Sequence, residues 1–145
     1  MTLKNLWTCP KCGRRFANRN QSHSCGHYNV KKHLKGKSPH PLSLYERFVA
    51  LVKQCGPVIL APTKTRIGFQ VRMIFAAVSF RQDSLNCHVC LSRHLENPRF
   101  TRIKSLSPRM HVHHFRIHSV EELDDEVADW LKEAYKVGEQ KHLPK

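Results

Sequence analysis

The first 119 of the 145 residues contain almost no acidic side chains. Only Glu46, Asp83 and Glu96 carry a carboxylate there, against 21 Lys and Arg, whereas the remaining residues hold eight acids and four Lys. The formal net charge is therefore +18 up to position 119 and −4 beyond it. Two-metal phosphoryl transfer needs clustered carboxylates to hold its ions. Three acids so far apart in the sequence argue against an enzyme of that class.

Long apolar runs are also missing, because no stretch approaches the roughly 20 residues that a membrane-spanning helix needs. No signal peptide precedes the first motif. The sequence therefore predicts a soluble, intracellular and cytoplasmic protein with no membrane partner. In a reducing compartment, its six cysteines are expected to be metal ligands or buried thiols rather than disulfides.

The sequence does contain a cysteine knuckle near its start. Cys9 and Cys12 lie in the string CPKCG, where the proline and the glycine favour a tight backbone that points both thiolates at one ion. Cys25 follows after twelve intervening residues, and His23 points the same way if this segment is extended. The pattern predicts a structural Zn²⁺ site with the ligands Cys9, Cys12, His23 and Cys25.

The fourth ligand of this site has a rival. A short helix predicted over residues 29–35 would offer His33 in place of His23, although seven residues separate it from Cys25, more than the usual roughly three to five. His27 is the weakest candidate because it lies so close to Cys25 in the chain. The alternative without metal is a set of unliganded thiols, but a segment this short and polar cannot bury enough surface to fold without an ion.

The chain divides into a zinc-finger-like module with a short helix over residues 1–36 and a second domain over residues 37–145. Ser-Pro and His-Pro steps before position 42 favour extended backbone and indicate a linker. The second domain is long enough to bury one hydrophobic core. It opens with a predicted helix over 43–55, which has a capping box at Ser43 and Glu46 and ends at Gly-Pro.

The rest of the second domain alternates short strands and then closes with a helix. Strands are predicted over 58–61, 66–72, 73–80, 85–91, around 100–103 and over 111–118, and a helix is predicted from Ser119 to Gly138. A meander is the simplest pairing of these strands. The predicted fold class is therefore α+β, with an antiparallel sheet of about five strands and a helix before and after it.

Cys87 and Cys90 form a second CxxC pair, but the strand pattern LNCHVCL places their side chains on opposite faces of the sheet. We therefore interpret both as structural. Strand 111–118 alternates in the same way, so His111 and His113 share one face. They are candidates for metal binding or acid–base chemistry, yet no paired carboxylate lies nearby in the sequence. The preferred interpretation is histidines that line a half-buried sheet.

Three strings in this sequence resemble a known family: WTCPKCGRRFANRNQSHSCG, PTKTRIGFQVR and HHFRIHSVEELDDEVADWLKEAYKVGEQ. The family is a bacterial one of unknown function, in which a short zinc-finger-like segment precedes a small α+β domain. The resemblance covers nearly the whole chain and implies this architecture, with no established activity. It also implies the zinc ligands named above, with His33 as the alternative, and singles out Lys64 and Thr65 in a turn between strands.

The excess of positive charge predicts a polyanionic partner, and nucleic acid is the commonest one. The sequence therefore predicts a zinc-containing protein that contacts the phosphates of DNA or RNA through its finger and linker. The predicted contacts are Arg14, Arg15, Arg19, Lys31, Lys32, Lys35, Lys37, Lys64 and Arg66.

Two other classes of function compete with nucleic-acid binding. In the first, the finger and the sheet dock an acidic protein partner. In the second, the protein is a phosphodiester-processing enzyme without metal, which uses His111, His113 or His114 together with Lys64. Binding to mixed DNA or RNA that weakens with salt favours nucleic acid, and binding only to a protein favours docking.

Overall fold

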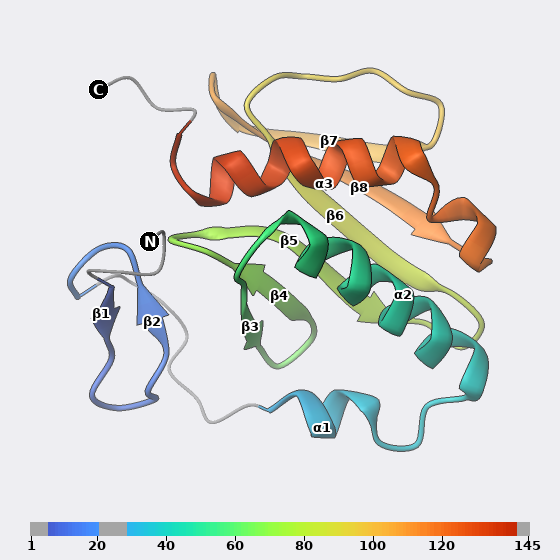
Figure 1. Ribbon diagram of the computed structural model, residues 1–145, viewed down its shortest axis with the longest axis horizontal. Helices are drawn as coiled ribbons and strands as arrows, with labels where there is room; N and C mark the ends of the chain where they lie inside the picture. Colours follow the sequence, from blue (N-terminus) through green and yellow to red (C-terminus); the bar gives the residue numbers. More distant parts are fainter. Residues whose placement is uncertain (1–5, 21–28, 142–145) are drawn as a thin grey trace.

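The computed structural model describes residues 6–20 and 29–141 and has an α+β fold (Figure 1). A two-stranded hairpin comes first, made of β1 (Trp7–Thr8) and β2 (Arg15–Phe16). The helices are α1 (Val30–Leu34), α2 (Pro39–Cys55) and α3 (Asp125–Gly138), with a 3-10 turn η1 (Val120–Glu122) before the last. The large sheet contains β3 (Ile59–Pro62), β4 (Ile67–Gln70), β5 (Ile74–Phe80), β6 (Leu85–Leu91), β7 (Phe100–Ser107) and β8 (Met110–Ile117).

All neighbouring strands of the large sheet are antiparallel, in the order β3-β4-β5-β6-β8-β7. The predicted α+β class is confirmed, but the sheet has six strands rather than about five. The difference lies in β7, where the sequence predicts only a short strand around 100–103. β7 is an edge strand, and most of its residues are exposed, so its polar and basic composition hides the usual alternation. The predicted meander holds for β3 to β6 and fails where β8 inserts between β6 and β7.

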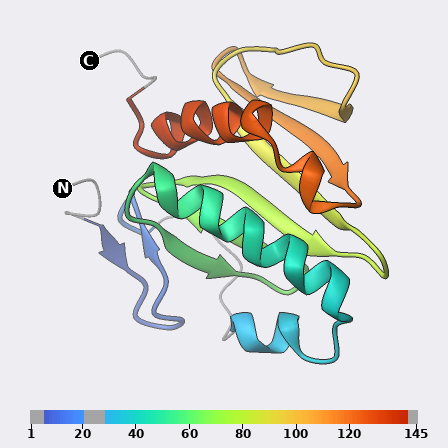
Figure 2. The ribbon, with the colours of Figure 1, turned by 45° about the vertical axis from the view of Figure 1, so that its right-hand side comes forward.

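Helices α2 and α3 lie together on one face of the sheet (Figures 1 and 2). The buried face of β6 carries Cys87, Val89 and two leucines, as its alternation predicts. Trp130 of α3 packs on Phe115 of β8, with their ring centroids 5.3 Å apart. The core therefore fills the space between the two helices and this face, and none of the helices within residues 6–20 and 29–141 covers the other face of the sheet.

The start of α2 differs from the prediction. The capping box proposed for Ser43 is wrong, since the helix begins four residues earlier at Pro39 and the Ser43 hydroxyl donates to the carbonyl of His40 at 2.7 Å. Proline is well suited to the first turn of a helix because its φ angle is already helical and its missing N–H group would have no partner there. The segment expected to be an extended linker is therefore partly helical.

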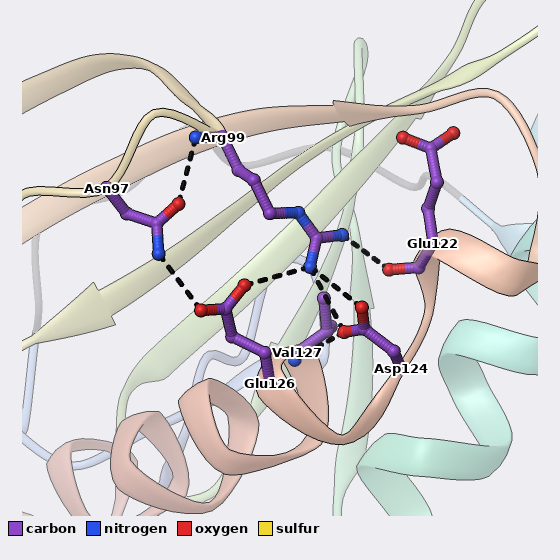
Figure 3. Close-up of polar contacts among 6 residues, drawn as sticks. All are labelled: Asn97, Arg99, Glu122, Asp124, Glu126 and Val127. Carbon is purple, nitrogen blue, oxygen red and sulfur yellow. Dashed lines mark hydrogen bonds and ion pairs between the residues drawn. The ribbon is translucent and has the colours of Figure 1, made fainter.

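The closing helix is interrupted after its first turn. A capping box forms between Ser119 and Glu122, but it caps only η1, and α3 starts anew with Asp124 accepting from the amide of Val127 at 3.2 Å. Arg99, from the loop between β6 and β7, binds across this break (Figure 3). Its guanidinium lies 3.0 Å from a carboxylate oxygen of Asp124 and 3.1 Å from one of Glu126.

This contact ties the loop over residues 92–99 to the helical layer. Arg93 adds a second ion pair, with its guanidinium donating twice to Glu133 at 3.0 Å. Three of the eleven acidic side chains are thus held on the helical side of the molecule by two arginines. None of the helices within the described residues is long and apolar enough to cross a membrane.

Candidate nucleic-acid interface

The cysteine knuckle is built by the turn between β1 and β2. The amide of Cys9 donates to the carbonyl of Arg14 at 2.8 Å, and the amide of Gly13 donates back to the carbonyl of Cys9 at 2.9 Å. Gly13 has a φ of 76°, a left-handed conformation that glycine adopts without steric cost. Cys9 is buried and Cys12 is half-buried. This tight turn, closed by reciprocal backbone hydrogen bonds, suits a pair of thiolate ligands for Zn²⁺.

The other two predicted zinc ligands, His23 and Cys25, lie outside the described residues, as does His27. Their rival His33 lies in α1, and its Nε2 is 2.6 Å from the carbonyl oxygen of Thr63. A carbonyl accepts only, so Nε2 carries the proton in this hydrogen bond. The bond commits one of the two ring nitrogens of His33 to joining α1 to the turn between β3 and β4.

The knuckle packs against β3 at the edge of the sheet (Figure 1). The side-chain amide of Gln70 donates to the carbonyl of Arg15 across 55 residues of sequence. Arg14 lies over the ring of Phe16, with 4.9 Å between the guanidinium carbon and the ring centroid. Arg14, Arg15 and Asn29 line a hollow of about 310 Å³ beside β3, and Arg19 is exposed beyond β2.

Three predicted contact residues meet at a second hollow, of about 290 Å³. Lys32 of α1, Lys37 of the following turn and Lys64 of the β3–β4 turn all line it, together with Asn29 and Thr63. The Lys37 ammonium also lies 5.6 Å from the centroid of the Phe80 ring. We refer to Lys32, Lys37 and Lys64 as the lysine cluster.

The other two predicted lysines, Lys31 and Lys35, are exposed on or next to α1 outside that hollow. Asn29 caps α1, because its side chain accepts from the amide of Lys32 at 2.9 Å. Since Asn29 lines both the knuckle hollow and the lysine hollow, these two basic regions adjoin.

A third hollow lies on the face of the sheet that no helix covers. Its centre is a row of residues that are direct partners across five strands: Gly68, Ala77, His88, His114 and Arg102. A parallel row contains Ser79, Asn86 and Arg116. Except for Gly68, these residues line a volume of about 330 Å³ together with the turn residues Thr65 and Arg66, and we call this volume the open-face hollow.

The hollow exists because its centre has small side chains and its edges have long ones. Ala77 and Ser79 leave space over β5, while Arg66 and Arg102 approach from opposite sides. The guanidinium of Arg116 donates through Nε to the Asn86 side chain at 2.9 Å. No Asp or Glu is among the described residues that line the hollow.

Two histidines form the floor of the open-face hollow. The rings of His88 and His114 are paired across β6 and β8, with their centroids 5.2 Å apart. Burial, followed by the neighbouring His114 and Arg66, lowers the pKa of His88 to about 3. Burial also lowers the pKa of His114, and the positive charges of Arg102, Arg66 and Lys104 act in the same direction. Both rings are therefore neutral near pH 7, in a strongly positive environment.

Of the predicted contact residues, only Arg66 reaches this hollow. The predictions missed Arg102, Arg116 and His88, and they named His114 only for an enzyme that would use it with Lys64, which lines the lysine hollow instead. The alternation of strand 111–118 does indicate a basic, polar face with His114 and Arg116. It cannot indicate that β7 supplies Arg102 to the same place, because the pairing of β7 with β8 is not a local property of the sequence.

Comparison with known protein families places most of the chain in a family. The family DUF5655, described as a domain of unknown function, matches residues 30–138. This range includes α1, the lysine cluster and the whole large sheet, and it excludes the knuckle. No curated protein and no protein of solved structure matches the chain.

Proposed function

The chain belongs to the DUF5655 family of domains of unknown function, and we propose that it is a zinc-containing protein that binds nucleic acid through phosphate contacts. The observation that carries this proposal is the convergence of Lys32, Lys37 and Lys64 on one hollow. Like charges repel, so such a cluster lowers the stability of the fold unless an anion binds there. A chain of phosphates supplies that anion.

The lysine hollow is linked to each of the other two hollows by shared or neighbouring residues, which supports a strand of phosphates rather than a single ion. Asn29 is shared by the knuckle hollow and the lysine hollow. The β3–β4 turn supplies Lys64 to the lysine hollow and Arg66 to the open-face hollow. Basic side chains therefore follow a path from the knuckle, past α1 and the turn, onto the uncovered face of the sheet.

Acidic charge lies mainly elsewhere, which further supports this surface as the binding one. The acids around η1 and α3 belong to the helical layer, and three of them bind Arg99 or Arg93 through their carboxylates. The helical layer and the open-face hollow are on opposite faces of the sheet. A polyanion approaching the basic path is therefore kept away from the acidic helix by the thickness of the sheet.

Zinc has a structural place in this proposal. Cys9 and Cys12, with His23 and Cys25, would hold the ion and so fix the loop that carries Arg14, Arg15 and Arg19 next to β3. The ion supplies folding energy rather than chemistry at such a site.

The proposal is tested by fluorescence anisotropy with labelled duplex DNA, single-stranded DNA and RNA of mixed sequence, over a series of salt concentrations. We expect affinity on duplex DNA to fall with salt at a log–log slope of about −4 to −6, which corresponds to five or six neutralised phosphates. Binding to neither DNA nor RNA at low salt would reject the proposal and leave docking of an acidic protein as the better candidate.

Two triple variants locate the contacts. Replacing Lys32, Lys37 and Lys64 by Ala should weaken binding to every sequence and reduce the slope by roughly 2 to 3, because each phosphate contact contributes about 0.9. The matched control replaces Lys53, Lys132 and Lys136, which lie on α2 and α3, and changes the net charge equally. If both variants lose the same affinity, net charge rather than the lysine cluster drives binding.

The finger is tested in the same way. Changing Arg14, Arg15 and Arg19 to Glu should flatten the slope and weaken binding to all sequences alike, provided that the zinc content is unchanged. An unaltered affinity and slope in this variant would remove the finger from the proposed contact surface.

A further inference from the structure

The open-face hollow differs from the lysine cluster because it is built on the sheet rather than on a short helix and turns. Its walls come from the β3–β4 turn and from the four strands β5, β6, β7 and β8. Strand pairing holds these parts in register. A site on rigid strands keeps its groups in position before a ligand arrives, which reduces the entropic cost of binding.

The groups in the hollow suit a phosphate. Arg66, Arg102 and Arg116 line it from different strands and turns, and guanidinium groups bind phosphate oxygens in pairs. Thr65, Thr101 and Ser79 add hydroxyl groups to the lining. Three cations facing one space without a neighbouring acid among the described lining residues create a strong positive potential, which an anion with more than one oxygen would offset.

The volume limits what can enter. About 330 Å³ is at the lower end of the range of small-ligand pockets. A single phosphate with its attached sugar fits such a space, whereas a duplex does not enter it. The hollow is therefore suited to one unit of a strand, in contrast to the extended basic path that leads to it.

The histidine floor adds a second property. Among the described residues, the charged or titratable groups that face His88 and His114 are Arg66 before β4, Cys90 on β6, Arg116 on β8, and Arg102 and Lys104 on β7. β5 presents only Ala77 and Ser79. Burial raises the pKa of Cys90 to about 11, so this thiol stays neutral near pH 7. No negative charge among these groups balances a proton on either ring.

We propose that the open-face hollow binds one phosphate group of a nucleic-acid strand and that His114 takes up a proton as the phosphate enters. The inference rests on the proposed function for the source of the phosphate. The bound anion offsets the charges of Arg102, Arg66 and Lys104, which disfavour protonation of His114 in the free protein. His88 is held neutral chiefly by burial, which an anion relieves less.

The test uses dimethyl phosphate and a dinucleoside monophosphate with the full chain, because a phosphodiester, unlike inorganic phosphate or a phosphate monoester, does not itself titrate near neutral pH. Calorimetric titration near pH 6.5, in two buffers with different heats of ionisation, measures the protons taken up per ligand bound. We expect uptake of a fraction of a proton, which falls toward zero by about pH 8, where the ring stays neutral even in the complex. Imidazole signals followed by NMR should assign this proton to His114. Binding with no proton uptake over this pH range overturns the linkage.

Variants locate the site. Arg102→Gln and Arg116→Gln should each weaken phosphate binding about tenfold, the loss expected for one charge-assisted hydrogen bond. His114→Gln should abolish proton uptake while it retains binding at pH 8. The matched control, Arg109→Gln, removes a guanidinium from the exposed β7–β8 turn and should leave phosphate binding unchanged. Equal affinity in wild type and Arg102→Gln would place the phosphate elsewhere.

A competition experiment separates this inference from the function on which it rests. Dimethyl phosphate should displace a single-stranded oligonucleotide from the Arg102→Gln variant less effectively than from the wild-type protein. If the oligonucleotide binds with the expected salt slope but phosphate and proton uptake are absent, the open-face inference fails and the proposed function stands. If phosphate binds with proton uptake but no oligonucleotide binds, the proposed function fails, and with it the assignment of the phosphate to a strand.

Discussion

His113 and His114 are adjacent in the chain and face opposite sides of the sheet. His114 lies in the open-face hollow, whereas His113 is fully buried on the helical side. Nδ1 of His113 donates to the carbonyl of His111 at 2.9 Å, and Nε2 accepts from the amide of Leu95 at 3.0 Å. Both ring nitrogens are thus occupied in a single neutral tautomer. His113 therefore positions the loop after β6, as the preferred interpretation of its strand anticipates, and is not a free acid or base.

We predict that His113→Ala lowers the free energy of unfolding by about 2 to 4 kcal/mol. The substitution leaves a cavity in the core and a buried Leu95 amide without its acceptor. Urea denaturation measures the loss. The control is His118→Ala, which truncates an exposed side chain and should cost less than about 0.5 kcal/mol. A similar loss in both variants would contradict the role given to His113.

The protonation states of the residues on β6 are set by their burial in the fold. His88 and Cys90 are two positions apart on β6, and both are pushed toward the neutral form by burial. Cys87, between the sheet and the helices, is neutral for the same reason, since burial raises its pKa well above the usual value. The second CxxC pair therefore consists of two protonated thiols on opposite faces, which is unsuited to a shared metal ion.

Among the elements, the knuckle is too small to hold its shape through packing alone. Phe16 and Cys9 are its buried apolar residues, and Trp7 lies 6.2 Å from Phe16 between ring centroids. Its two strands have only two residues each. A hairpin of this length is marginal in water, so the ion is required in our proposal to stabilise it.

We therefore predict one zinc per chain in purified protein, measured by elemental analysis. Cys9→Ser and Cys12→Ser should each lose the metal, because serine is a poor replacement for a thiolate ligand. Cys90→Ser, the matched control, should keep it, since this side chain lies on the face of β6 opposite Cys87. Full zinc in the Cys9 variant would refute the assignment, and so would loss of zinc in the Cys90 variant.

For the whole molecule, the two faces of the sheet differ in charge and in their response to pH. His88, His113 and His114 all have a pKa lowered mainly by burial, so the folded protein binds fewer protons than the unfolded chain under acidic conditions. Above the unfolded-state histidine pKa of about 6.5, these three side chains do not change the free energy of unfolding with pH. Stability is then lost as the pH falls below this value, and for His88 the loss continues to about pH 3.

We predict that the free energy of unfolding decreases between pH 7.5 and pH 5. His88 alone should account for about 2 kcal/mol, at a limiting slope of about 1.4 kcal/mol per pH unit. Urea denaturation over this range measures it. His88→Gln should flatten the profile, whereas His118→Gln, which changes an exposed histidine, should leave its slope unchanged. An unaltered slope in the His88 variant would show that its ring is protonated in the folded protein.

Local sequence determined the elements and the faces of this protein. The alternation in LNCHVCL and HVHHFRIH was enough to predict which side chains of β6 and β8 face the helices, because successive side chains of a strand point to opposite sides. It did not predict that Cys90, on the opposite face, is buried as well. The apolar stripe of α3 and the turn chemistry of the knuckle are equally local. Asn29 to Lys35 was also predicted as a helix, and α1 covers most of it.

Tertiary structure decided what these elements bring together. The insertion of β8 between β6 and β7 places Arg102 opposite His114 and leaves a basic hollow at the centre of the sheet. The packing of α1 on the β3–β4 turn gathers three lysines that are up to 32 positions apart. Pairing and register depend on the total burial of both helices and all strands, which no short window of sequence contains. The basic composition could therefore be read from the chain, but the site that concentrates it could not.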